Sequence, residues 1–185
     1  IELLKKGELF SPKDIQVDME ACCPHSCEFC TYRNVNWQNY GMDFEEPEKR
    51  VPEETGLPRE IALRLPGEMY EAGIPSIELT GGGEPMVYPY IKEFLEELAK
   101  YPIELAIVTN GASLNEHIQS RLKNLKWIRF SLDAFTAETH SKVHRVPPSV
   151  FSVVLKHIKE VVARGFEDCK VGISFVITKH NYHEI

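Results

Sequence analysis

Short apolar segments alternate with longer amphipathic ones along this chain, and the alternation restricts the folds that it can adopt. Four helix-like segments separate five strand-like segments. Strands joined by helices of this length form β-α-β crossovers and therefore a parallel sheet. The strand-like segments are residues 15–21, 76–80, 104–109, 127–133 and 170–178, and the helix-like segments are residues 58–73, 88–100, 114–125 and 150–164. The sequence thus predicts an α/β fold in which about five βα units form part of a TIM-like barrel rather than a complete one.

Proline, glycine and cap residues mark the boundaries of the expected helices. Pro66 would begin a second piece of the first helix, because proline suits the first helical turn. Ser113 or Asn115 would cap the third helix. Gly165 would end the fourth helix, since glycine readily takes the left-handed conformation found after a helix.

The cysteines are concentrated in one loop, residues 22–30, directly after the first expected strand. We call this segment the cysteine loop. Within it, Cys23, Cys27 and Cys30 have the spacing C-x₃-C-x₂-C. Three such thiols can hold three irons of a four-iron cluster, whereas a cluster ligated only by cysteine uses four thiols. The missing fourth thiol would leave one metal position open, and an open position is typical of catalytic metal sites.

A structural zinc site is the alternative interpretation of the cysteine loop. Structural zinc takes four protein ligands, usually in two separate pairs, and the second pair is absent here. Cys22 and His25 could complete a set, but Cys22 and Cys23 would point to opposite sides if strand geometry continued. We therefore expect Cys22, like the distant Cys169, to be a small buried residue.

Glycines and polar residues follow the later strands at the points where each strand ends. The second strand runs into residues 80–85 (TGGGEP), the third ends in residues 109–111 (TNG) and the fourth in residues 131–134 (SLDA). Ligands of parallel α/β folds bind at the carboxyl ends of the strands. These segments are therefore expected to converge, together with the cysteine loop, on one ligand site.

Individual residues at these ends have both a structural and a functional interpretation. The triple glycine could be a simple turn, but a third glycine suggests close approach of the backbone to a ligand. Glu84 could accept hydrogen bonds from an ammonium group. Ser131 and Asp133 could cap a helix, or share one strand face and bind a ribose or substrate. Arg145, near His140 and His144, could be a solvated charge or an anion clamp.

Composition limits the class of protein and its partners. With 185 residues, the chain is expected to form one domain over residues 1–185. Its net charge of −7 makes nucleic acid an improbable main partner. No apolar run reaches membrane-spanning length, so no membrane partner is expected. An odd, clustered set of cysteines without a signal peptide predicts a reducing compartment, the cytoplasm.

Taken together, these motifs resemble those of the radical S-adenosylmethionine (SAM) superfamily, over about residues 15–185. The cysteine loop matches with Phe29 as its aromatic residue, and residues 82–85 match the GGEP element. Residues 109–111, 131–134, 140–145 and 179–184 (KHNYHE) match later parts of the family pattern. The resemblance implies a partial (β/α)₆ barrel that carries a [4Fe-4S] cluster, whose open iron chelates the amino and carboxylate groups of SAM.

The resemblance also implies roles for individual residues. Metal ligation falls to Cys23, Cys27 and Cys30. Phe29 would lie near the adenine, and Ser131 near the ribose or methionine. The methionine amino group would be held by residues 82–84 and the carboxylate by Arg145, while Asn110 and Asp133 would line the pocket. The implied SAM contacts are Phe29, Gly82, Gly83, Glu84, Pro85, Thr109, Asn110, Ser131, Asp133 and Arg145.

The implied chemistry is reductive and oxygen-sensitive. The cluster would pass one electron to SAM, and the resulting 5′-deoxyadenosyl radical would abstract a hydrogen atom from a peptide or small metabolite. The electron would come from a donor such as flavodoxin or ferredoxin. The alternative is a non-catalytic iron–sulfur protein for electron transfer or sensing, which explains the thiols but not GGEP or the polar strand ends.

The chain departs from the family pattern in several places. Arg145-Val146 replaces the usual arginine-glycine pair. A sixth strand and the cysteines of auxiliary clusters are expected beyond residue 185, because the chain begins at Ile1 and ends in a helix-like segment. Residues 31–56 form a long polar loop, for which we hypothesise a lid or substrate-recognition role as an alternative to an ordinary surface loop. Its candidate contacts are Asn34, Asn36, Trp37 and Tyr40.

Overall fold

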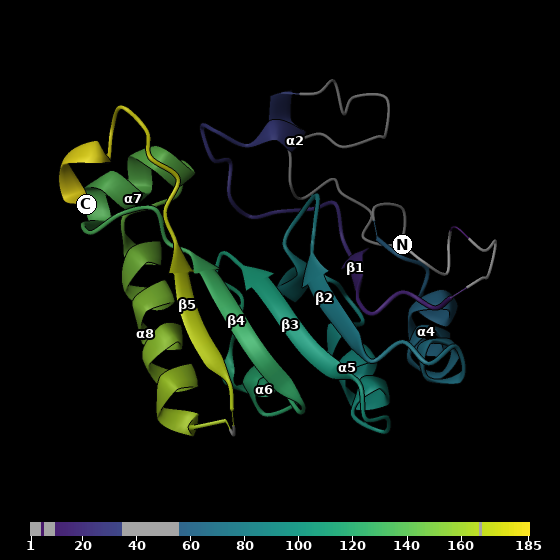
Figure 1. Ribbon diagram of the computed structural model, residues 1–185. Helices are drawn as coiled ribbons and strands as arrows, with labels where there is room; N and C mark the ends of the chain where they lie inside the picture. Colours follow the sequence, from purple (N-terminus) through teal and green to yellow (C-terminus); the bar gives the residue numbers. More distant parts are fainter. Residues whose placement is uncertain (1–4, 6–9, 35–55, 167) are drawn as a thin grey trace.

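The computed structural model describes residues 5, 10–34, 56–166 and 168–185, and within these ranges it contains one five-stranded parallel sheet (Figure 1). The strands follow one another in space in the same order as in the chain, and each neighbouring pair is parallel. They are β1 (Ile15–Asp18), β2 (Ser76–Thr80), β3 (Glu104–Thr109), β4 (Leu125–Ser131) and β5 (Lys170–Ser174). The predicted α/β fold with a partial barrel is confirmed.

The main crossover helices lie on one face of the sheet, because successive right-handed crossovers in one direction place them on the same side (Figure 1). Figure 1 shows α7 and the last short helix beyond the carboxyl ends of β4 and β5. The helices are α2 (Thr31–Asn34), α4 (Arg59–Glu71), η3 (Pro85–Val87), α5 (Ile91–Leu98), α6 (Glu116–Gln119), α7 (Ala137–His144), α8 (Ser149–Arg164) and η4 (Tyr182–Glu184).

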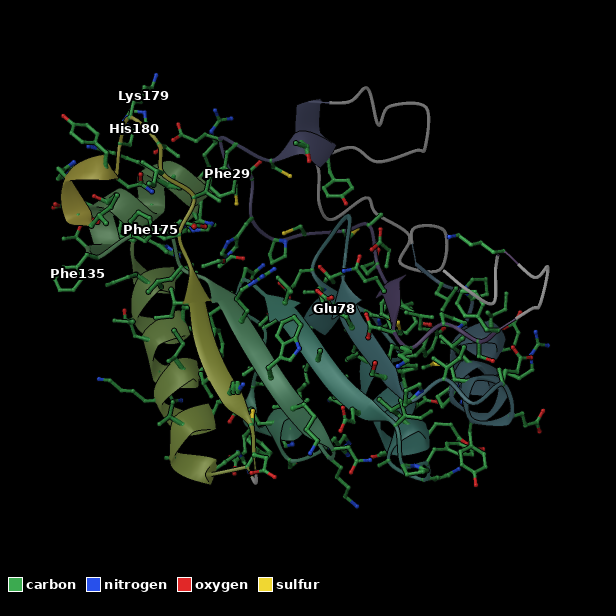
Figure 2. The ribbon with its side chains drawn as sticks, in the orientation of Figure 1. Phe29, Glu78, Phe135, Phe175, Lys179 and His180 are labelled. Carbon is green, nitrogen blue, oxygen red and sulfur yellow. The ribbon has the colours of Figure 1, made fainter. Side chains whose placement is uncertain are left out.

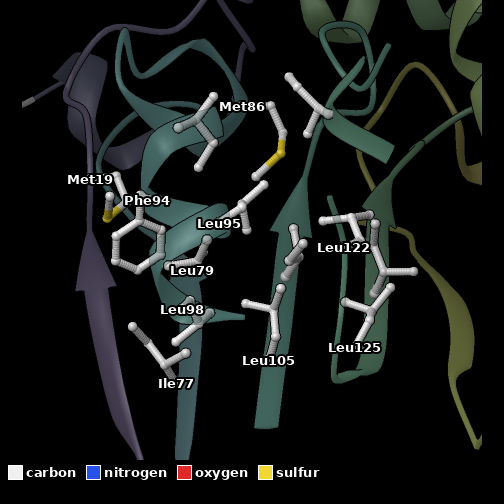
Figure 3. Close-up of a cluster of buried hydrophobic side chains, with 14 of the residues drawn as sticks. Met19, Ile77, Leu79, Met86, Phe94, Leu95, Leu98, Leu105, Leu122 and Leu125 are labelled. Atoms are coloured by element: carbon white, nitrogen blue, oxygen red, sulfur yellow. The ribbon is translucent and has the colours of Figure 1, made fainter. Parts of the chain in front are cut away.

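The core lies between the helix-facing side of the sheet and the helices (Figure 3). Ile77 and Leu79 are fully buried, whereas the residues that alternate with them on β2 are only half-buried. Register places Ile77 beside Leu105 of β3, and the buried Phe94 and Leu98 of α5 belong to the same cluster. Burying each such side chain contributes about 1.5–3 kcal/mol, so the alternation of apolar residues decides which face of the sheet packs against helices.

The opposite face of the sheet is more polar. On this face the Nε2 of Gln16 donates a hydrogen bond to the Glu78 carboxylate at 2.8 Å. Parallel register aligns Gln16 with Glu78, and Glu78 with Ala106, on one row. Because the side chains of paired residues share a face, this row lines the concave side of the partial barrel.

The third crossover helix is shorter than predicted. The helix expected over residues 114–125 is formed only by Glu116–Gln119, and Asn115 caps it by accepting a hydrogen bond from the Ile118 amide at 3.2 Å. Leu122 and Leu125, which extend the helical apolar pattern, instead pack into the core from a turn and from the start of β4. The turn passes through Asn124, whose φ is 57°.

Several other boundaries differ from their predicted positions. Pro66 is buried inside the single helix α4 and does not begin a second piece. α5 begins at Ile91, three residues later than predicted, because residues 88–90 form a turn between η3 and the helix. β5 ends at Ser174, four residues early. Gly165 ends α8 as predicted, in the left-handed conformation with φ 58°. In the part of the chain that the structure describes, every helix is too short or too polar to cross a bilayer.

Candidate cluster and cofactor site

A cavity of about 260 Å³ lies where the cysteine loop meets the carboxyl ends of β2, β3 and β4. Ten of the thirteen predicted site residues line it, which agrees with the expected convergence of the strand ends. These are Cys23, Cys27, Phe29, Cys30, Gly82, Gly83, Glu84, Thr109, Asn110 and Ser131. The other lining residues include His25, Tyr32 and His144.

The cysteine loop is attached to the end of α7 by backbone hydrogen bonds. The Ser26 amide donates to the His144 carbonyl at 3.0 Å, and the Glu28 amide donates to the Val143 carbonyl at 2.9 Å. The last carbonyls of a helix lack intrahelical partners, so the loop satisfies groups that would otherwise need water. The Glu84 amide donates to the Cys22 carbonyl at 2.8 Å and thereby joins the same loop to the end of β2.

The C-terminal segment also contacts the cysteine loop. The Nε2 of His180 lies 3.4 Å from the Glu28 carboxylate, and Figure 2 shows His180 near Phe29, above the end of β5. Phe29 itself lines the cavity and lies with its ring edge toward His144, at a centroid distance of 6.1 Å. The loop is therefore supported by β2, α7 and the segment after β5.

The three predicted ligand thiols line one cavity, and the environment of Cys23 and Cys27 disfavours their free thiolates. Burial, followed by the nearby Glu84 charge, raises the pKa of Cys23 to about 12. Burial likewise raises the pKa of Cys27. Thiolates are the form that binds metal, so a cationic group must compensate for their charge in this site.

The donor set fits an iron–sulfur cluster better than a closed zinc site. Cys22 does not line the cavity, so no fourth thiol joins Cys23, Cys27 and Cys30 there. Among the described residues, these three thiols do not form a group whose ligand atoms all lie within 4.8 Å of one another, as ligands of a single ion would. Cys169 is half-buried and packs against the core, as expected of a small apolar residue.

Glu84 is the centre of a buried hydrogen-bond network between β2 and β3. One carboxylate oxygen accepts from the Thr109 hydroxyl at 2.6 Å and from the Met86 amide at 3.1 Å. The other accepts from the Asn110 amide at 2.7 Å. Burial raises the pKa of Glu84, while these donors oppose the shift. The carboxylate therefore already has protein partners, and its predicted contact with an ammonium group stays a prediction.

Two of the three consecutive glycines are required by the protein's own packing. A Cβ on Gly83 would lie 2.3 Å from the Cys22 carbonyl oxygen, and Gly81 has φ 134° with Asp18 against it. At Gly82 the nearest atoms to a Cβ belong to Tyr32, at 3.5 Å. The close backbone approach inferred from the glycines thus occurs between Gly83 and the cysteine loop, and Gly82 alone has ordinary space beside the cavity.

Of the two polar residues at the end of β4, only Asp133 takes a position different from the one expected. Ser131 lines the cavity, but Asp133 is fully buried and does not share its strand face. The chain leaves β4 at Ser131, and Asp133 has φ 53°, which turns its side chain away. One Asp133 oxygen accepts a hydrogen bond from the Val176 amide at 2.6 Å. Asp133 therefore fixes the segment after β5 rather than lining the cavity.

Arg145 and Pro85 also lie outside the cavity. Arg145 is exposed and forms the left-handed cap at the end of α7, with φ 53°. Pro85 is buried as the first residue of η3. The anion-clamp role of Arg145 therefore remains a prediction. Of the polar loop over residues 31–56, residues 35–55 lie outside the described residues, and with them the candidate contacts Asn36, Trp37 and Tyr40.

The main site residues that sequence reasoning missed are histidines. His140 and His144 lie one turn apart on α7, and both are buried beside His25 of the cysteine loop. The Nδ1 of His144 lies 3.0 Å from the Cys27 sulfur. The spacing of four residues between His140 and His144 was a usable signal, because it places both rings on one helix face.

Known proteins match both the sequence and the fold. Mycofactocin maturase MftC of Mycobacterium ulcerans is 31% identical over 107 residues, which are 57% of this chain and 28% of that protein. The S-adenosylmethionine-dependent nucleotide dehydratase of Flammeovirga pacifica is 25% identical over 166 residues, which are 88% and 52% of the two chains. This chain thus spans about half or less of the length of these curated relatives.

The solved structure of Streptococcus suis SuiB bound to precursor peptide SuiA has the same fold. Its TM-score is 0.70 at 22% identity, with 98% of this chain and 37% of that chain covered. A family model described as the radical SAM superfamily matches residues 21–185, nearly the whole chain. The chain therefore belongs to the radical SAM superfamily, whose members are enzymes that use a [4Fe-4S] cluster and SAM.

Proposed function

We propose that this chain binds a [4Fe-4S] cluster through Cys23, Cys27 and Cys30 and cleaves SAM reductively to start a radical reaction. The observation that carries the proposal is the single cavity into which these thiols and the ends of three strands project. With a cluster held by these thiols and SAM bound beside it, the cofactors would supply the one-electron chemistry that removes a hydrogen atom from the substrate.

The protein's own residues bind, position and shield the reacting groups. Phe29 offers an aromatic face to the adenine at one side of the cavity. Gly82 leaves space for the methionine end, and Ser131 offers a hydroxyl to the ribose or methionine. Asn110 donates through its side-chain amide to the Cys23 sulfur at 3.6 Å and so helps to hold one ligand in place. The cysteine loop supplies one wall of the cavity, and a bound cofactor there would displace water from the reacting groups.

The substrate is proposed to be a peptide or a small metabolite. The peptide is favoured by the fold match to SuiB, which was solved with a precursor peptide bound. The small metabolite is supported by the relative named as a nucleotide dehydratase. A one-electron donor such as flavodoxin or ferredoxin would reduce the cluster, and a reducing compartment such as the cytoplasm would protect its thiol ligands.

Product analysis after anaerobic reconstitution tests this function. The protein is loaded with iron and sulfide, reduced with dithionite and mixed with SAM, and 5′-deoxyadenosine is measured by mass spectrometry. We expect product from the unmodified chain and from Cys169→Ser, which changes a cysteine outside the cavity, but none from Cys27→Ala. Equal product from Cys27→Ala would contradict the ligand assignment, and a cluster that never supports cleavage would contradict the function.

A further inference from the structure

A second group of potential metal ligands overlaps the cluster site. One ligand atom each of His25, Cys27 and His144 lies within 4.8 Å of the other two. The Nδ1 atoms of His25 and His144 are 3.4 Å apart, and the His144 Nδ1 is 3.0 Å from the Cys27 sulfur. These separations suit three ligands that occupy three corners of a tetrahedral coordination sphere. The three-thiol cluster site uses neither of the two histidines as a ligand.

The hydrogen bonding of His144 orients it as a metal ligand. Its Nε2 lies 3.1 Å from the Leu132 carbonyl oxygen. A carbonyl only accepts hydrogen bonds, so in the neutral ring the proton is on Nε2 and the lone pair of Nδ1 points toward Cys27. Metal-binding histidines usually donate their second N–H to a carbonyl or carboxylate in this way.

The charges around the group also favour a divalent ion. One oxygen of the fully buried Asp133 has no hydrogen-bond partner and lies 3.4 Å from the His144 Nε2. A divalent ion bound to the Cys27 thiolate would have a net charge of +1, and the Asp133 carboxylate would neutralise it. Without an ion, the unpaired oxygen is costly in a buried position.

We propose that the cluster-free protein binds one Zn²⁺ through His25, Cys27 and His144, with water from the cavity at the fourth position. Nitrogen and sulfur ligands in this number are typical of open zinc sites. Binding releases the Cys27 thiol proton to solvent as the Zn–S bond forms. Because Cys27 belongs to both ligand sets, zinc and the cluster exclude each other; this exclusion, but not the zinc site itself, rests on the proposed function.

Zinc competition titrations of the cluster-free chain, made anaerobically against a chromophoric chelator, test the site directly. We expect one equivalent of Zn²⁺ to bind, and His144→Gln or His25→Gln to weaken its affinity by at least about 10-fold, since even indirect partners of metal ligands are worth about 10–100-fold. Co²⁺ should show a thiolate charge-transfer band that is lost in Cys27→Ser. His157→Gln changes a buried histidine outside the three-ligand group, bonded to the Gly111 carbonyl; it is the matched control and should bind zinc normally.

Cys23→Ser separates the zinc site from the cluster site. It should keep the zinc affinity while failing to assemble a cluster, whereas His144→Gln should assemble a cluster and lose zinc affinity. Circular dichroism confirms that each variant is folded. Absence of stoichiometric zinc binding, or zinc affinity that depends on Cys23 and Cys30 but not on the histidines, would overturn the site.

Preloading with zinc tests the exclusion. One equivalent of Zn²⁺ should suppress the cluster absorption formed from iron and sulfide in the unmodified chain, but not in His144→Gln. Equal cluster formation in zinc-loaded and metal-free protein would refute the exclusion. Because this readout is absorption rather than SAM cleavage, its failure is distinguishable from failure of the proposed function.

Discussion

Buried polar groups near the cavity are fully hydrogen-bonded on one side and partly unpaired on the other. On the β2–β3 side, the Glu84 carboxylate accepts hydrogen bonds at both oxygens. On the α7 side, both ring nitrogens of His140, the Nε2 of His25 and one oxygen of Asp133 have no hydrogen-bond partner. A satisfied network stabilises a single geometry, whereas unsatisfied buried groups cost free energy that a ligand can recover. The β2–β3 side is therefore a fixed scaffold, whereas the α7 side keeps unpaired polar atoms next to the proposed zinc ligands.

Among these substitutions, replacement of Glu84 should lower the free energy of unfolding most. Glu84→Ala leaves the Thr109 hydroxyl and the Met86 and Asn110 amides without their acceptor. Each buried donor left without an acceptor costs about 1–3 kcal/mol, so the free energy of unfolding should fall by about 3 kcal/mol or more. Denaturant unfolding of the metal-free chain measures this. A loss below about 1 kcal/mol would show that the network is not the scaffold.

The glycine pair offers a matched test of the same side. Gly83→Ala forces a Cβ against the Cys22 carbonyl and should lower the free energy of unfolding by about 1–3 kcal/mol. Gly82→Ala meets only the Tyr32 ring at ordinary contact distance and should stay within about 0.5 kcal/mol of the unmodified chain. We expect Gly82→Ala to weaken SAM binding, as measured by calorimetry of the cluster-loaded protein. Equal stability losses in the two variants would contradict the assigned packing.

Replacement of His140 should change the free energy of unfolding only slightly, and toward higher rather than lower stability. Neither ring nitrogen of this buried residue has a partner, so His140→Leu removes two unsatisfied polar atoms and retains much of the volume. The free energy of unfolding should be unchanged or rise by up to about 1 kcal/mol at neutral pH. A loss above about 2 kcal/mol would show that His140 makes a stabilising interaction, and the contrast between the two sides would fail.

The same variant should change the dependence of stability on pH. Burial, and then His144, lowers the pKa of His140 to about 4, below its ordinary value of 6.5. Below pH 6.5 the unfolded chain therefore binds a proton that the folded chain does not, and stability falls by about 1.4 kcal/mol per pH unit down to about pH 4.

The difference between the two proteins isolates this contribution. Burial raises the pKa of Asp133 to about 6, so its protonation opposes the trend, but it does so in both proteins. The stability advantage of His140→Leu should therefore grow as pH falls from 6.5 to about 4. Parallel pH profiles of the two proteins would show that His140 is not held neutral in the fold.

The alternation of strands and helices in the sequence was enough to predict a parallel sheet. It also predicted that the site lies at the carboxyl ends of the strands. It could not predict the length of α6, since Leu122 and Leu125 suit a helix face and a strand start equally well. The position of Asp133 depends on a left-handed backbone at one residue, which no local pattern required. The meeting of His25 with His144 is a contact between residues 119 positions apart, and only the folded chain reveals it.

Electron paramagnetic resonance of the reduced, cluster-loaded chain, recorded with and without SAM, tests the central claim most directly. If Cys23, Cys27 and Cys30 hold a [4Fe-4S] cluster with one open iron, SAM should change the signal of the reduced cluster, and Cys27→Ala should show no such cluster. A reduced cluster whose signal is unaffected by saturating SAM would contradict the account, because it would leave no open iron for the cofactor.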